Sequence, residues 1–194
     1  MTEIIINDKI SYIEHTSSPL SADIGIIRSE GEIWLFDVGN DIRTAEELNE
    51  SYNVVLSHFH ADHIGSLDRI NVKEVYSSRE TFRHINRGII AENDLYIGEL
   101  HIFSLPSSHS KGCVGLEVGE YAFAGDALYG RVKDGKLIYN SQLLKEEIDR
   151  LKKLEARFLL VSHRDGFIRN KSEIITELEE IYGKRTSASP FIEI

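Results

Sequence analysis

The stretch that decides the fold comprises residues 53–65 and reads NVVLSHFHADHIG. It opens with three apolar residues, 54–56, which are typical of a short buried strand. Three histidines and an aspartate follow within six residues: His58, His60, Asp62 and His63. Imidazole and carboxylate groups bind metals, and α/β proteins place their chemistry in the loops that leave strand ends. The stretch therefore predicts a buried strand that leads into a metal-binding loop.

The composition is ordinary for a globular domain, with 41% hydrophobic and 28% charged residues. A net charge of −10 disfavours nucleic acid as a partner, since proteins that bind it usually carry a basic stripe. The lone cysteine, Cys113, excludes an intrachain disulfide. The N-terminus lacks the basic and apolar segments of a signal peptide, and no apolar run is long enough to span a membrane. We therefore expect a cytoplasmic protein without a membrane partner.

The order of apolar runs and turn signals predicts two halves of similar design, roughly 1–87 and 88–183. Each begins with a run of strands and ends with alternating strands and helices. Two such halves can pack their sheets face to face with helices outside, which is an α/β fold of the αββα sandwich type. The expected strands are 4–6, 10–14, 23–28, 32–37, 54–56, 72–76, 95–105, 114–118, 121–124, 131–133, 136–138 and 158–161. The expected helices are a short one capped by Thr44, 78–87 capped by Ser78, 141–156, and one that begins at Asn170 or Ser172 and ends at Gly183, with 88–94 as a loop.

Three further candidate ligands follow apolar strands elsewhere in the chain. His109 lies in the loop after 95–105, Asp126 comes just after 121–124, and His163 comes just after 158–161. Each therefore occupies the same kind of position as the histidines of residues 53–65. We expect these strand ends to converge on one site.

The ligand types fit two divalent ions, because zinc prefers imidazole nitrogen and carboxylate oxygen. Two ions about 3.5–4 Å apart can hold a hydroxide between them, and such sites hydrolyse esters and phosphodiesters. Asp126 can bridge the ions, since a carboxylate has two oxygens. The first ion can take His58, His60 and His109, and the second can take Asp62, His63 and His163.

These residues resemble the metallo-β-lactamase-fold hydrolases. Residues 57–65 contain the HxHxDH signature of that superfamily, and residues 36–39, FDVG, are similar to its early Asp-x-Gly motif. Residues 109–113, HSKGC, resemble its His-[Ser/Thr]-x-Gly motif, and 124–128, AGDAL, resemble the Gly-Asp-x-Leu motif of the glyoxalase II branch. The resemblance covers most of the chain. It implies an αββα fold and a dinuclear metal site.

Within the superfamily, the motifs are nearest to the glyoxalase II and lactonase-like branch. An aspartate at the place of Asp126 is typical of that branch and of phosphodiesterases, whereas β-lactamases with a cysteine ligand need cysteine there. Glyoxalase II proteins carry a C-terminal helical domain that helps to bind glutathione. We expect instead a single domain, 1–194, without a separate C-terminal substrate domain. Tyr129 matches a tyrosine that quorum-signal lactonases place beside the substrate carbonyl, where a phenol could hydrogen-bond an oxyanion.

The main functional hypothesis is a dinuclear metallohydrolase whose metal-bridging hydroxide attacks a small thioester, lactone or other ester. Asp62, besides its role as ligand, and Tyr129 are the candidate catalytic residues. Zinc is the expected metal, with iron and manganese as alternatives. A homodimer stays open, because either a partner subunit or residues 88–94 could cover the site.

Three other functions are weighed against this hypothesis. A mononuclear iron enzyme of the persulfide dioxygenase type shares the fold, but His63 and His163 argue for a second ion. A phosphodiesterase or RNA-processing nuclease uses the same ligands, but the acidic charge disfavours it. A non-catalytic binding protein is disfavoured because every ligand position is filled.

The remaining candidates have plainer interpretations. We expect Asp37 to orient the histidine loop through hydrogen bonds rather than to bind metal. Cys113 is expected to be a small buried residue. His15, His84 and His101 are expected to be ordinary surface or core residues.

Overall fold

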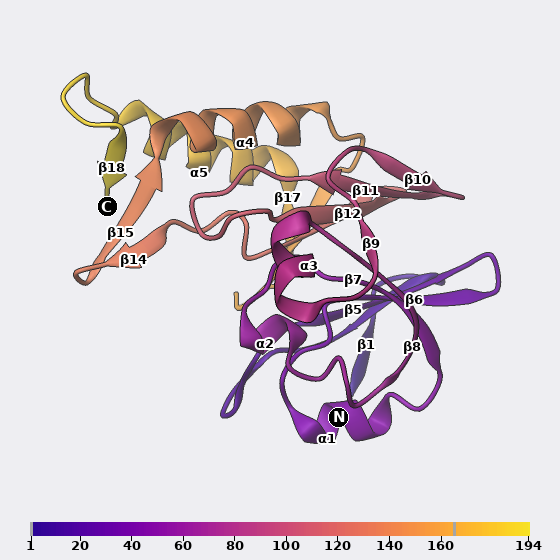
Figure 1. Ribbon diagram of the computed structural model, residues 1–194. Coiled ribbons are helices and arrows are strands. Elements are labelled where there is room, and N and C mark those ends of the chain that lie inside the picture. The colour runs from indigo at the N-terminus through magenta and orange to yellow at the C-terminus, as the bar shows by residue number, and fades with distance from the viewer. Residues whose placement is uncertain (1, 165) are drawn as a thin grey trace.

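Two β-sheets pack face to face in the computed structural model, which describes residues 2–164 and 166–194 (Figure 1). The first sheet has the strand order β1-β2-β5-β6-β7-β8-β9, and the second has the order β10-β11-β12-β13-β16-β17. A three-stranded sheet, β14-β15-β18, and the β3-β4 pair lie outside these two. The strands are β1 (Glu3–Ile5), β2 (Ile10–Ile13), β3 (Thr16–Ser17), β4 (Leu20–Ser21), β5 (Ile24–Ser29), β6 (Glu32–Phe36), β7 (Ser51–Val55), β8 (Asn71–Ser77), β9 (Ile89–Ile90), β10 (Leu95–Ile97), β11 (Leu100–Ser104), β12 (Val114–Val118), β13 (Tyr121–Gly125), β14 (Arg131–Lys133), β15 (Lys136–Asn140), β16 (Phe158–Val161), β17 (Ile168–Asn170) and β18 (Phe191–Glu193). The helices are α1 (Ile42–Glu47), α2 (Ala61–Ile64), α3 (Arg79–Ile85), α4 (Ser141–Lys153) and α5 (Lys171–Gly183).

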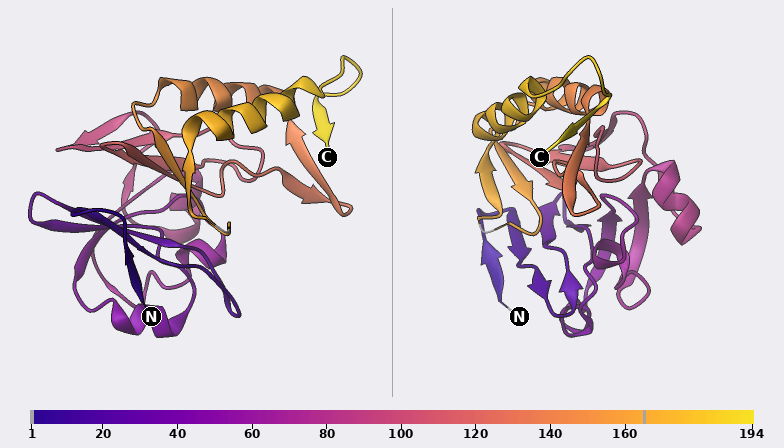
Figure 2. Two further views of the ribbon diagram at one scale, coloured as in Figure 1. Left: turned by 180° about the vertical axis from the view of Figure 1, so that it is seen from behind. Right: turned by 90° about the vertical axis from the view of Figure 1, so that its left-hand side faces the viewer.

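The two sheets form the inner layers of an αββα sandwich, as the sequence predicts. Strand residues alternate between the two faces of a sheet, so β7 sends Val55 into the core between the sheets and Val54 to the outer face. On that outer face, Leu48 and Leu67 cover the first sheet near α1 and α2. Helices α4 and α5 cover the outer face of the second sheet (Figures 1 and 2).

A glycine allows the two sheets to approach closely. Gly25 on β5 faces Phe123 on β13, and a Cβ at residue 25 would lie 2.3 Å from the phenylalanine ring. Phe123 also packs against Phe36, with ring centroids 5.3 Å apart. Any larger side chain at position 25 would displace the Phe123 ring from its present position in the core between the sheets.

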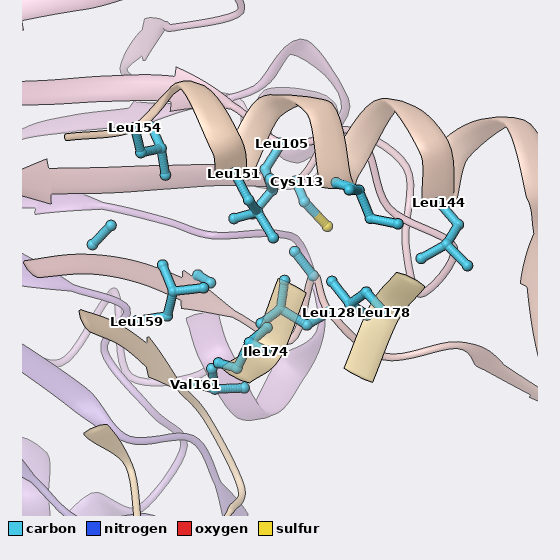
Figure 3. Packing of buried hydrophobic residues seen from close by; sticks show 14 of the residues in the cluster. Leu105, Cys113, Leu128, Leu144, Leu151, Leu154, Leu159, Val161, Ile174 and Leu178 are labelled. Carbon is cyan, nitrogen blue, oxygen red and sulfur yellow. The ribbon is translucent and has the colours of Figure 1, made fainter. Parts of the chain in front are cut away.

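Helix α4 begins where the sequence predicts and ends three residues early. Asn140 caps it, with its side-chain oxygen accepting hydrogen bonds from the backbone N–H groups of Gln142 and Leu143. One face of the helix places Leu144 and Leu151 over the second sheet (Figure 3). Leu154 lies on the same side but has extended backbone angles, so its side chain packs into the core after the helix has ended.

Several local predictions are wrong, and each error has a physical reason. Thr44 lies inside α1; Asp41 is the cap instead, because its carboxylate accepts a hydrogen bond from the N–H of Arg43. The segment 88–94 is not all loop, because Ile89 and Ile90 pair with β8 as β9. The first sheet therefore extends to residue 90 and the second begins at residue 95, beyond the expected boundary at 87 and 88. Strands β3, β4, β17 and β18 were not predicted, since they have only two or three residues each, too few for a pattern of apolar residues. Strand β18 also depends on pairing with β15, which is distant in the chain.

Parallel pairing brings the site-bearing loops to one edge of each sheet. Strands β6, β7 and β8 run parallel to one another in the first sheet, and β13 runs parallel to β16 in the second. Parallel strands have their carboxyl ends at the same edge, where α/β proteins bind ligands. The loops after β7, β13 and β16 carry six of the seven candidate ligands, and His109 lies in the loop after β11.

Candidate metal centre

The seven predicted metal ligands lie in two neighbouring groups. His58, His60 and His109 form the three-histidine group. The mixed group consists of Asp62, His63, Asp126 and His163. Within each group, the candidate ligand atoms all lie within 4.8 Å of one another. Residues from the two halves of the chain thus meet in both groups.

The three-histidine group combines one loop of each sheet. His58 follows β7, and His60 precedes the short helix α2. His109 reaches them from the loop after β11, with its Nε2 atom 3.1 Å from Nδ1 of His60. The ring centroid of His58 lies 4.4 Å from that of His60 and 5.1 Å from that of His109. Three imidazoles that converge in this way can bind one cation.

The mixed group alternates carboxylates and imidazoles. His163 Nε2 lies 3.1 Å from Oδ2 of Asp62 and 3.8 Å from Oδ1 of Asp126. His63 Nε2 lies 3.4 Å from the same Asp126 oxygen. The other oxygen of Asp126, Oδ2, points to the three-histidine group and lies 3.5 Å from Nε2 of His109. Asp126 therefore stands between the groups with one oxygen on each side.

Four of the converging atoms are buried yet make no hydrogen bond of acceptable geometry with the described residues. Buried polar atoms normally have a partner, so each exception needs an explanation. A cation coordinated by these atoms provides one, and nitrogen and carboxylate oxygen are the donors that zinc accepts. The residues thus fit a metal ion in both groups. The four atoms are Nε2 of His58, Nε2 of His63, Nε2 of His163 and Oδ1 of Asp126.

Burial keeps the three-histidine group in the form that binds metal. It lowers the pKa of His58 far below the usual value, and the neighbouring histidines add to this effect. Burial also lowers the pKa of His60 and His109, although nearby carboxylates oppose it. Neutral imidazole is the metal ligand, so these residues need to release little or no proton at neutral pH.

In the mixed group, by contrast, the pKa values of the two histidines are raised. Burial alone would lower the pKa of His63, but Asp37 and Asp126 outweigh it and raise that pKa to about 10. For His163, burial is likewise outweighed by Asp62 and Asp126, so its pKa is raised. A cation would have to displace protons from these two imidazoles, and it would take over their role of balancing the carboxylates.

Asp37 and Ser57 contact two of the ligands, His58 and His63, at their Nδ1 atoms. Asp37 accepts hydrogen bonds through Oδ1 from the Ser57 N–H and through Oδ2 from the Ser57 hydroxyl, both at 2.7 Å. Ser57 Oγ lies 3.0 Å from Nδ1 of His58, and Asp37 Oδ2 lies 2.7 Å from Nδ1 of His63. These contacts have the orienting character expected of Asp37. Gly125, on the other sheet, packs directly against Ser57. A Cβ at position 125 would lie 2.7 Å from the Cβ of Ser57, so only glycine fits there.

Tyr129 lies beside the centre with its hydroxyl already engaged. The hydroxyl donates a hydrogen bond of 2.5 Å to the backbone carbonyl of Ser162, and the ring centroid lies 6.3 Å from that of His109. Burial raises the pKa of the phenol to about 12. The guanidinium carbon of Arg164 lies over the ring, 5.3 Å from its centroid. Tyr129 is thus a neutral hydrogen-bond donor at the edge of the centre.

Two further residues border the metal centre: His15, which the sequence interpretation treated as ordinary, and Asp23, which it did not consider. The ring of His15 lies 5.7 Å from that of His163, and both backbone N–H groups donate to the buried carboxylate of Asp23. The only sequence signal for Asp23 is an acidic residue at the start of an apolar strand. His84 stacks on Phe59, whose ring lies 5.2 Å from that of His60, whereas His101 stacks on Tyr96 outside the ligand groups.

Comparison with known proteins gives a match by structure alone. No protein-family model matches the sequence, and no curated protein matches it. A B3 metallo-β-lactamase with an active-site glutamic acid superposes with a TM-score of 0.70 at 13% identity, over 95% of this chain and 90% of that one. A metallo-β-lactamase from Hirschia baltica gives 0.68 at 17%, over 93% and 97%. ETHE1 from Myxococcus xanthus gives 0.63 at 19%, over 91% and 85%. Likeness at this level establishes a common fold.

Proposed function

We propose that this chain, which has the metallo-β-lactamase fold, is a dinuclear metal-dependent hydrolase that acts on a small thioester, lactone or other ester. The observation that carries the proposal is the pair of converging ligand groups, in which four buried nitrogen and oxygen atoms have no hydrogen-bond partner among the described residues. A non-catalytic protein has no need to keep seven such residues converged. We expect zinc in both groups, with iron or manganese as alternatives.

Each part of the centre has a separate task in this proposal. Two divalent ions lower the pKa of bound water and polarise a carbonyl oxygen, which is the chemistry that ester hydrolysis needs. His58, His60 and His109 would hold one ion, and Asp62, His63 and His163 would hold the other. Asp126 would bind both, because its two oxygens face opposite groups.

The surrounding residues orient the ligand side chains toward the metal ions. The Asp37 carboxylate accepts a hydrogen bond from the Nδ1–H group of His63. Nε2 is therefore the nitrogen of this imidazole that is left to bind metal. Tyr129 is a candidate for binding the substrate oxygen. To do so, its hydroxyl has to exchange the Ser162 carbonyl for the substrate. Small substrates are favoured because the net charge of −10 disfavours nucleic acids.

A mononuclear iron oxygenase of the persulfide dioxygenase type is the second candidate. It is favoured by the three-histidine group, which together with the near oxygen of Asp126 could hold one metal alone. The presence of His63 and His163 in a second complete group favours two ions. The two candidates differ in metal content and in their use of oxygen.

Elemental analysis of the purified protein, followed by a substrate screen, tests the proposal. We expect close to two metal ions per chain and hydrolysis within a panel of thioesters, lactones, β-lactams and phosphodiesters. Metal-free protein should be inactive and should regain activity with added zinc. One iron per chain with oxygen consumption on a glutathione persulfide would replace the hydrolase with the oxygenase. Full activity without metal would overturn both.

A further inference from the structure

A buried carboxylate outside the ligand set joins two loops at the edge of the metal centre. Asp23 precedes β5 and is 2% exposed. Its Oδ2 atom accepts a hydrogen bond of 3.0 Å from the backbone N–H of His163, and its Oδ1 atom accepts one of 3.1 Å from the N–H of His15. Nδ1 of the His15 ring lies 3.3 Å from Oδ2. One side chain thus connects the loop after β2 with the loop after β16.

The backbone that Asp23 holds has an unusual conformation. His163 has a φ of 61°, in the left-handed region that residues other than glycine seldom adopt. Such a conformation persists only where the surroundings hold it in place. The preceding residue, Ser162, is tied to the second sheet by donating its N–H to the Gly125 carbonyl at 3.2 Å. At His163 itself, the backbone N–H is bonded to Asp23.

The direction of the His163 side chain follows from this backbone. Its Nε2 atom is buried without a hydrogen bond to the described residues and lies 3.1 Å from Oδ2 of Asp62. If the φ of His163 relaxed to a common negative value, the imidazole would leave this position. Asp37 cannot compensate, because its side chain, among the described residues, hydrogen-bonds to His63 and Ser57 and not to His163.

We propose that Asp23 is a positioning residue for the metal in the mixed group, acting by holding His163 in its left-handed conformation. This inference rests on the proposed dinuclear function. Two buried carboxylates then orient the two imidazoles of the mixed group: Asp37 hydrogen-bonds to the His63 ring, and Asp23 to the His163 backbone. Loss of Asp23 weakens metal binding in the mixed group and leaves the three-histidine group intact.

The test measures metal retained per folded chain across a series of chelator concentrations, for wild type and variants. In Asp23→Ala, one of the two ions should be lost at a chelator strength about 10- to 100-fold lower than in wild type, the usual effect of removing a residue that orients a ligand. The other ion should be retained as in wild type. Asp23→Asn keeps one accepting oxygen and should weaken the binding of this ion less than Asp23→Ala does. The asparagine variant also provides the test if the alanine variant does not fold.

Three further variants separate positioning from general destabilisation. Asp41→Asn changes another buried aspartate, whose side chain hydrogen-bonds within α1, and should keep both ions. His15→Ala leaves the bond between Asp23 and the His163 N–H in place and should also keep both. His163→Ala should lose the same ion, and adding Asp23→Ala to it should cause no further loss, because the residue acted upon is already absent.

The outcomes distinguish this role from the proposed function. Wild type with two ions and Asp23→Ala with two ions at unchanged affinity overturns the role of Asp23 alone. So does an equal loss in Asp41→Asn, or an additive loss in the double variant. Wild type without a second ion overturns the dinuclear function and, with it, this role.

Discussion

Oδ2 of Asp37 lies 2.7 Å from Nδ1 of His63, and both side chains are fully buried. This pair fixes which nitrogen of the imidazole is free, because a proton on Nδ1 is held by the carboxylate and Nε2 faces the centre. The same carboxylate binds Ser57, which contacts His58. One buried aspartate thus orients a ligand in each group.

Asp37→Asn should weaken metal binding by about 10- to 100-fold. Asparagine is the apt replacement, because Asp37 has a φ of 60° and asparagine tolerates that region. The amide keeps the shape but loses the charge that holds the His63 proton. Titration of metal-free protein with zinc against a chromophoric chelator measures the effect. Unchanged affinity in Asp37→Asn would show that the charge of Asp37 is not needed.

Asp126→Ala should abolish turnover and lower the metal content, since this carboxylate faces both groups. Cys113→Ala is the control: Cys113 is buried outside the ligand set, burial raises the pKa of its thiol to about 12, and its Sγ atom donates a weak hydrogen bond of 3.5 Å to the Ser110 carbonyl. The control should lose about 1 kcal/mol of stability or less while keeping its metal and its activity. Metal analysis and a rate measurement on both variants decide the point. An active Asp126→Ala variant would contradict the bridging role.

Tyr129→Phe tests whether the phenol stabilises an oxyanion. Because its hydroxyl donates to the Ser162 carbonyl, we expect the variant to lose about 0.5–1.5 kcal/mol of stability and kcat to fall by less than about tenfold. An oxyanion donor would be worth about 100-fold or more in kcat. Urea unfolding gives the first quantity and steady-state kinetics the second. A hundredfold loss in kcat at wild-type stability would assign the catalytic role to Tyr129.

The buried side chain of Glu147 should make the protein less stable as the pH rises. This side chain on α4 is fully buried with both carboxylate oxygens free of hydrogen bonds to the described residues, and burial raises its pKa well above the usual 4.5. A group whose pKa is raised on folding contributes its full stability below pH 4.5 and loses it as pH rises through the folded pKa. Glu147→Gln should therefore be more stable than wild type at pH 8, by about 1–3 kcal/mol, with a smaller difference at pH 4.5.

Urea unfolding of both proteins at the two pH values measures the effect of Glu147. Glu146→Gln provides the matched control, since its neighbouring side chain is exposed. That control should change stability by no more than about 0.5 kcal/mol at either pH. An equal gain at both pH values would mean that ionisation of Glu147 is not the cause.

The sequence predicts the ligands better than it predicts their supports. His58, His60, Asp62 and His63 are close in the chain, and His109, Asp126 and His163 each follow an apolar strand, so local patterns suffice to find them. Asp23 could not be found in this way. Its hydrogen bond to His163 joins residues 140 positions apart, and no local pattern records that contact.

The same distinction holds for the fold. Apolar strands such as β12 and β16, and the amphipathic helix α4, are visible in the sequence because their own residues determine them. The two-residue strand β9 exists because β8 offers it a parallel partner. The helix cap at Asp41, in place of Thr44, depends on backbone geometry that residue types alone leave open.

Both ligand groups take residues from each sheet, which makes a bound ion a cross-link between the two halves of the molecule. Ions that bind only the native chain add to its free energy of unfolding in proportion to the logarithm of their concentration. The halves should therefore unfold as one cooperative unit when metal is present. Removal of the ions should leave the halves joined by the apolar core between the sheets, by hydrogen bonds such as that from the His163 N–H to Asp23, and by the connecting chain. The availability of metal would therefore govern the lifetime of the folded protein as well as its chemistry.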